Sequence, residues 1–86
     1  MTHLILLTRN GCTLCDELKP IAVEAGATIE NMDTDADALA LGTLHGVDIV
    51  PTLLECEAPT MQDILSPTTE TRIYVGEDAR KRLEAM

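Results

Sequence analysis

An apolar run near the beginning of the chain, residues 3–8 (HLILLT), most constrains the fold. It lacks the alternation of apolar and polar residues that is typical of a strand with one solvent-exposed face. It therefore predicts a strand covered on both faces, as in the middle of a parallel sheet. Asn10-Gly11 then turns the chain. Over residues 12–25 apolar residues recur at helical spacing, which predicts a helix that ends near Gly26.

A second strand and a second helix follow. Residues 28–33 (TIENMD) mix apolar and polar side chains, which predicts a strand at the edge of the sheet. Thr34 and Asp37 approximate a capping box, so we expect a helix to start there and to end at Gly46. The order strand, helix, strand, helix indicates a right-handed crossover between parallel strands.

The rest of the chain predicts two more strands and a third helix. In residues 47–56 (VDIVPTLLEC), Pro51 should begin a strand, because proline has no N–H for a central ladder. Residues 71–75 (TRIYV) predict the last strand, followed by a helix from Gly76 to about Met86. The connection over residues 57–70 is longer than most hairpin loops. We therefore expect a single α/β domain, 1–86, with an inserted loop at about 57–70.

Charge and composition argue against several classes of partner. Fifteen acidic residues against six basic ones give a net charge of -9, which repels polyanionic nucleic acid. One Tyr, with no Phe or Trp, gives no aromatic platform for single-stranded bases. The apolar residues 4–7 are too few for a membrane span or a signal-peptide core. We expect a cytoplasmic monomer that binds neither nucleic acid nor membrane.

Cys12 and Cys15 form a C-x-x-C pair at the start of the first predicted helix. There the Cys12 sulfur lies near unsatisfied backbone N–H groups and the positive end of the helix dipole, which favours the thiolate. Cys15 falls on the same helical face, within bonding reach. Cys12 can therefore attack a disulfide, and Cys15 can then displace the substrate thiol.

The surroundings of the pair leave other interpretations open. Arg9 favours a Cys12 thiolate, whereas Asp16 and Glu17 oppose it, and we expect a Cys12 pKa below that of a free thiol. Cys56 closes an apolar strand and is interpreted as a small buried hydrophobe. Zinc usually needs four Cys or His ligands, and the chain has no second paired motif. A metal ion or iron–sulfur cluster shared by two molecules through Cys12 stays an alternative.

Two motifs carry a resemblance to a known family. GCTLC (residues 11–15) resembles the thioredoxin superfamily, and LTRNGCTLC (residues 7–15) looks most like the opening of small glutaredoxin-like proteins. HGVDIVPTLL (residues 45–54) is similar to the superfamily's loop and proline-initiated strand. The resemblance implies a four-stranded mixed sheet, in the order second, first, third, fourth strand, with three helices. It also implies a cis Val50-Pro51 bond whose backbone lies beside Cys12 and pairs with an extended thiol substrate.

The resemblance also suggests which residues bind the substrate. Arg9 stands where glutaredoxins often place a base for a glutathione carboxylate. The Gly-Gly and paired aspartates that bind glutathione are represented by Gly76 and Asp78 within VGED (residues 75–78). Thr13-Leu14 is neither the Gly-Pro of thioredoxins nor the Pro-Tyr of glutaredoxins, so this dipeptide assigns no subfamily. The expected substrate-binding residues are Arg9, Thr13, Val50, Pro51, Gly76 and Asp78.

Together these features predict a thiol–disulfide oxidoreductase of glutaredoxin or thioredoxin type, with Cys12 as nucleophile and Cys15 as resolving thiol. We expect no bound cofactor, with electrons supplied by glutathione or a thioredoxin-type donor. Partners would be proteins with thiols or disulfides, or glutathione. The alternatives are a non-catalytic binding or adaptor module of the same fold, and a metal or iron–sulfur carrier that uses the C-x-x-C pair.

Overall fold

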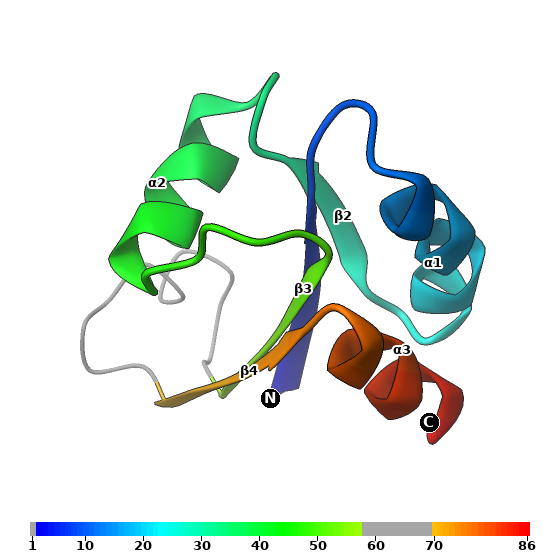
Figure 1. The fold of residues 1–86 in the computed structure, drawn as a ribbon. Coiled ribbons are helices and arrows are strands. Elements are labelled where there is room, and N and C mark those ends of the chain that lie inside the picture. The colour runs from blue at the N-terminus through cyan, green and yellow to red at the C-terminus, as the bar shows by residue number, and fades with distance from the viewer. Residues whose placement is uncertain (1, 58–69) are drawn as a thin grey trace.

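The computed structural model describes residues 2–57 and 70–86, which form an α/β structure (Figure 1). The expected inserted loop at about 57–70 lies, apart from its two ends, outside the described residues. None of the described helices has the length and apolar character needed to cross a membrane. The elements in chain order are β1 (Thr2–Thr8), α1 (Thr13–Glu24), β2 (Thr28–Asn31), α2 (Ala36–Leu44), β3 (Thr52–Glu57), β4 (Glu70–Val75) and α3 (Glu77–Glu84).

The strands form a mixed four-stranded sheet in the order β2-β1-β3-β4. β1 pairs in parallel with β2 and antiparallel with β3, and β3 pairs antiparallel with β4. The predicted strand order and the parallel crossover are therefore confirmed, as is the edge position of the second strand. This arrangement is compatible with a thioredoxin-like fold.

Helices cover both faces of the sheet, with α1 and α3 on one side and α2 on the other (Figure 1). Alternate residues of β1 contribute to the two faces, since Ile5 and Leu7 pack with α2 whereas Leu6 packs with α1 and α3. The apolar run is thus covered on both faces, as predicted. Gly42 lets α2 come close to β2, because a Cβ there would lie 2.6 Å from the Met32 Sδ.

The second helix begins one residue later than its sequence predicts. The N–H groups of Thr34 and Asp35 both donate to the carbonyl of Asn31, at 3.3 and 2.9 Å, which forms a turn before the helix. Asp35 is then the extended N-cap residue, and its carboxylate accepts from the amides of Asp37 (2.9 Å) and Ala38 (3.4 Å). The expected capping box starting at Thr34 is therefore wrong. Both residue types can cap a helix, and the turn selects Asp35.

β1, β3 and β4 have register partners at the same end of the sheet. Leu7 near the end of β1 pairs with Thr52 at the start of β3, and Thr52 pairs with Val75 at the end of β4. The segment that carries Cys12 follows β1, and Pro51 directly precedes β3. These segments therefore meet at one end of the sheet, which we call the Cys12 edge.

Candidate active site

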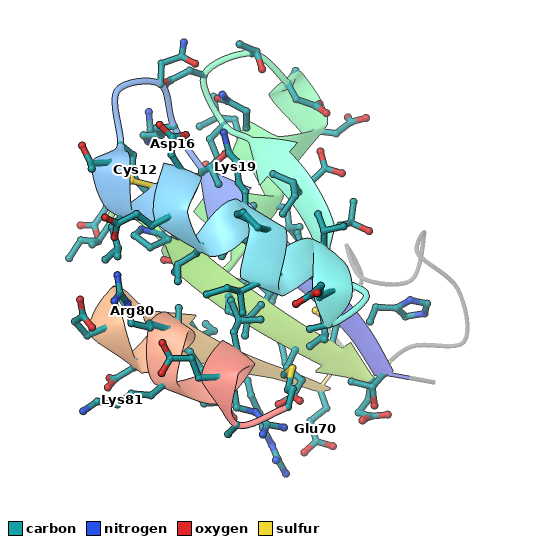
Figure 2. The ribbon with its side chains drawn as sticks, turned by 90° about the vertical axis from the view of Figure 1, so that its right-hand side faces the viewer. Cys12, Asp16, Lys19, Glu70, Arg80 and Lys81 are labelled. Atoms are coloured by element: carbon teal, nitrogen blue, oxygen red, sulfur yellow. A yellow bond between two sulfur atoms is a disulfide. The ribbon has the colours of Figure 1, made fainter. Side chains whose placement is uncertain are left out.

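Cys12 and Cys15 form a disulfide at the N-terminal end of α1 (Figure 2). Cys12 is the N-cap residue of the helix, and its Sγ accepts a hydrogen bond of 3.1 Å from the Cys15 amide. The predicted position of the pair at the head of a helix is confirmed. Cys12 is half-buried, whereas Cys15 is fully buried. A sulfur atom that approaches from solvent would therefore reach Cys12 before Cys15.

One carboxylate holds the turn that leads to Cys12. The Asp33 carboxylate accepts from the Arg9 Nη1 at 2.8 Å and from the Asn10 amide at 2.9 Å. The Asn31 side chain also donates to the Asn10 Oδ1, at 3.0 Å. Arg9 lies at the Cys12 edge, and its contact with a substrate stays a prediction. Its charge, however, is compensated by Asp33.

The loop before β3 is fixed at two points. The Val50-Pro51 peptide bond is cis, as the resemblance implies, and Pro51 is fully buried. The Thr52 hydroxyl donates to the Ile49 carbonyl at 2.5 Å, and the Gly76 amide donates to the Pro51 carbonyl at 2.8 Å. The first bond ties the loop to its own strand, and the second ties it to the turn between β4 and α3.

The remaining expected substrate-binding residues also lie at the Cys12 edge. Thr13 opens α1 and is exposed between the two cysteines. Gly76 is the N-cap residue of α3, and Asp78 is exposed in the first turn of that helix, where a carboxylate complements the helix dipole. Val50 is half-buried and packs against the core under α2. Contact of these residues with a substrate stays a prediction.

An ion pair connects α1 and α3, the two helices that cover the same face of the sheet. The Arg80 side chain of α3 lies 2.8 Å from the Glu17 carboxylate of α1 and 3.6 Å from that of Glu77. Lys19 lies 3.1 Å from Asp16 within the first turns of α1, and both residues appear with Arg80 and Cys12 in Figure 2. The two acids that oppose a Cys12 thiolate are thus each paired with a base.

A small cavity that no short motif in the sequence indicates lies beside the Pro51 loop. It measures about 80 Å³. A signal for it exists in retrospect, because Ile49 stands directly before Val50-Pro51 and because Ile73 and Val75 alternate along β4. The cavity is lined by residues of the α2–β3 loop, β3 and β4: His45, Gly46, Val47, Asp48, Ile49, Thr52, Ile73 and Val75.

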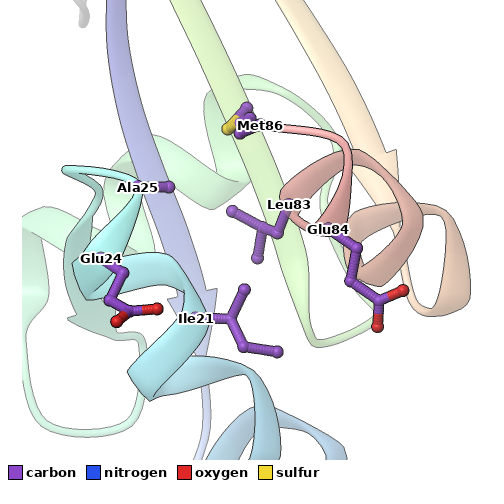
Figure 3. Close-up of a pocket in the computed structure, with 6 residues that line it drawn as sticks. All are labelled: Ile21, Glu24, Ala25, Leu83, Glu84 and Met86. Atoms are coloured by element: carbon purple, nitrogen blue, oxygen red, sulfur yellow. The ribbon is translucent and has the colours of Figure 1, made fainter.

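A wider hollow of about 630 Å³ lies at the other end of α1, away from the disulfide (Figure 3). Ile21 and Leu83 point into it from α1 and α3, and Glu24 and Glu84 stand at its rim. Ile21, its lining residue nearest to Cys12 along α1, stands nine positions after Cys12, so the hollow begins about 14 Å along the helix from it. It is therefore separate from the candidate active site.

Cys56 and His45 are two further side chains of types that can take part in catalysis. Cys56 is fully buried in β3, where burial raises the pKa of its thiol and the Thr71 hydroxyl lies 3.6 Å from its Sγ. This environment is that of a small buried hydrophobe. Burial also lowers the pKa of His45, the C-cap residue of α2. Within residues 2–57 and 70–86, no group of three or more His, Cys, Asp or Glu side chains is arranged to hold a metal ion.

Known protein families and curated proteins give no relative for this chain. Neither a model of a protein family nor a curated protein matches its sequence. Its function must therefore be inferred from the geometry of the Cys12 edge.

Proposed function

We propose that the protein is a thiol–disulfide oxidoreductase of the thioredoxin superfamily, with a glutaredoxin-like fold. The observation that carries the proposal is the Cys12–Cys15 disulfide at a helix N-terminus, with Cys12 accessible and Cys15 buried. This asymmetry supports the proposed roles. Cys12 is the nucleophile that meets the substrate, and Cys15 is the resolving thiol.

The exchange requires no group beyond the two thiols and the substrate. In the reduced protein, the Cys12 thiolate bonds to one sulfur of a substrate disulfide while the substrate S–S bond breaks and the other sulfur leaves as a thiolate. Cys15 then loses its proton to solvent and attacks the Cys12 Sγ, which releases the second substrate sulfur. Two electrons pass to the substrate, which becomes two thiols, and the protein becomes the disulfide.

The helix terminus supports the attacking thiolate. The Cys15 amide, 3.1 Å from the Cys12 Sγ, donates to a sulfur that gains negative charge on reduction, and the helix dipole acts in the same direction. Asp16 and Glu17 oppose this effect, but Lys19 and Arg80 compensate for them. A Cys12 pKa below the free-thiol value near 8.5 is the expected result.

Pro51 and its loop form the other wall of the proposed substrate groove. Because the loop is tied to β3 and to the β4–α3 turn, the backbone at Val50 is held in place at the same edge as Cys12. An extended segment on either side of a substrate cysteine would pair with this backbone. A thioredoxin-type dithiol donor in the cytoplasm would then reduce the protein again.

The test is a redox titration against glutathione buffers that follows free thiols in the wild type, Cys12→Ser and Cys15→Ser. We expect a reversible two-electron transition in the wild type that both substitutions abolish. Absorbance of the thiolate in Cys15→Ser then gives the Cys12 pKa. Thiols that do not equilibrate would overturn the proposal and favour an adaptor module. Protein isolated with zinc or an iron–sulfur chromophore would instead favour a carrier.

A further inference from the structure

The cavity beside Pro51 opens on an exposed apolar surface. Ile49, Ile73 and Val75 line the cavity and are 58%, 43% and 38% exposed. Single exposed apolar side chains are ordinary, but three around one cavity form a patch of the kind that binds partners. We call these three residues the Ile73 patch.

The position of this patch in the sheet explains why it is exposed. Ile73 pairs with Leu54 across β3 and β4, and Leu54 packs in the core under α2. α2 covers that face over β1, β2 and β3, but Ile73 and Val75 lie one strand further out. Among the described residues no helix extends over β4 on this side. Within residues 2–57 and 70–86, the patch is thus an uncovered end of the face under α2.

The patch lies close to the position of a bound substrate. Val75 pairs with Thr52, which directly follows Pro51, and the Gly76 amide binds the Pro51 carbonyl at 2.8 Å. The disulfide lies at the end of α1 and the patch on the face under α2, so a polypeptide that reaches Cys12 must pass over the end of the sheet at Pro51 to bring a neighbouring side chain to this cavity. The volume of about 80 Å³ is several times the roughly 10–15 Å³ that a cavity needs to hold one water molecule, so the cavity can accept part of an apolar side chain.

Negative charge prevails at the Cys12 edge, and three of the bases near it are already paired. Arg9, Lys19 and Arg80 each contact a carboxylate. Asp48, at the cavity, and Asp78, in the first turn of α3, form no ion pair within residues 2–57 and 70–86. An approaching cation is therefore attracted, while an anion finds Arg9, Lys19 and Arg80 already paired.

This charge distribution disfavours glutathione. Glutathione carries more carboxylates than ammonium groups, and Arg9, the base expected to bind one of those carboxylates, is occupied by Asp33 at 2.8 Å. Like charges at a binding surface slow encounter, and opposite charges accelerate it. The partner that fits both the patch and the charge is a cationic polypeptide with an apolar residue.

We propose that the exchange site selects a polypeptide disulfide whose cysteine has an apolar neighbour and nearby Lys or Arg side chains. The apolar side chain enters the cavity of the Ile73 patch, and the cations face Asp48 and Asp78. This inference rests on the proposed exchange function. The two-thiol reaction described above stays unchanged, and the protein's dithiol supplies the two electrons.

The test measures how fast Cys12 forms a mixed disulfide in Cys15→Ser, where the product cannot be resolved and accumulates. The probes are symmetric disulfides of short synthetic peptides: Lys-rich with Leu beside Cys, Glu-rich with Leu beside Cys, and Lys-rich with Ser in place of Leu. Oxidised glutathione and the uncharged hydroxyethyl disulfide complete the set. At low salt we expect the Lys-Leu peptide to react about tenfold or more faster than the Glu-Leu peptide, and the gap to shrink at high salt.

Substitutions assign the selectivity to particular residues. The double variant Asp48→Asn with Asp78→Asn should reduce the difference in reaction rate between the Lys-rich and Glu-rich peptides. The control is Glu24→Gln with Glu84→Gln, which makes the same charge change at the distant hollow (Figure 3). This control should leave the difference in rate unchanged. In the parent protein the Lys-rich peptide with Leu should react faster than the one with Ser, and Ile73→Thr should remove this difference in rate. Equal rates for all charged probes, or glutathione as the fastest, would overturn the substrate class while exchange stands. If even hydroxyethyl disulfide fails to react, the exchange function itself is wrong.

Discussion

The amide of Gly76 donates a hydrogen bond of 2.8 Å to the carbonyl oxygen of Pro51. The bond joins the turn between β4 and α3 to the loop beside the disulfide. At Gly76 φ is +59°, a value that residues with a side chain rarely adopt. The position of Pro51 therefore depends on a turn that requires glycine.

Gly76→Ala should lower the free energy of unfolding by about 1–2 kcal/mol and slow thiol–disulfide exchange. A Cβ at this position would meet no atom within 4 Å, so the cost is backbone strain, which moves the Pro51 loop. Urea unfolding and mixed-disulfide kinetics measure the two effects. Gly26→Ala is the matched control, since Gly26 also has a positive φ (+85°) and open space but lies between α1 and β2. It should lose similar stability and keep its exchange rate. Equal slowing in both variants would contradict the prediction.

Asp33→Asn should increase the reactivity of Cys12 toward oxidised glutathione. The substitution removes the charge that compensates Arg9 but keeps an oxygen that accepts from the Asn10 amide. Arg9 is then available to attract an anionic substrate. Stability should fall by about 0.5 kcal/mol or less, because the ion pair is exposed. The double variant Arg9→Gln with Asp33→Asn should return to the rate of the wild type. An unchanged rate in the single variant would show that Arg9 does not face the substrate.

Asp35→Ala should destabilise the protein by about 1 kcal/mol, the usual cost of losing an N-cap side chain. Thr34→Ala should cost little, because Asp35 and not Thr34 caps α2. Thermal or urea unfolding of the two variants provides the comparison. Asp35→Ser should retain most of the stability, since serine is also a good cap. A larger loss of stability in Thr34→Ala than in Asp35→Ala would mean that Thr34 caps the helix, as the capping-box pattern predicts.

His45→Asn should flatten the dependence of stability on pH. Burial lowers the pKa of His45 below its ordinary value of 6.5, so the unfolded chain binds a proton more readily than the folded chain. Wild-type stability should therefore rise with pH from the lowered folded pKa up to about 6.5 and then level off. Urea midpoints of both proteins between pH 5 and 7.5 test this. The same slope in both would assign the effect to other groups.

The sequence predicts the elements well where one local pattern decides them. The apolar run of β1 and the turn at Asn10-Gly11 depend on neighbouring residues, and so does the helical spacing after Cys12. The C-terminal end of the second helix is also marked locally, by Gly46. Its N-cap is not, because Thr34 and Asp35 are both good capping residues. The hydrogen bonds of both amides to the Asn31 carbonyl decide between them.

The details of the candidate site depend on contacts between distant segments. Asp33 neutralises Arg9 across 24 positions of sequence, which requires the parallel pairing of β1 and β2. The cavity beside Pro51 combines the α2–β3 loop with outward-facing residues of β4. No short motif encodes either feature. Each becomes visible when the sheet order and register are known.

The register of β3 and β4 has a practical consequence for protein engineering. Thr52 pairs with Val75 at the Cys12 edge, and five residues further along β3 Glu57 pairs with Glu70, about 17 Å away. Figure 2 shows Glu70 far from Cys12. A fluorescent reporter or affinity tag spliced between Glu57 and Glu70 would be anchored at the far end of the hairpin. That junction is the natural attachment point for cargo in a sensor that reads the state of the disulfide.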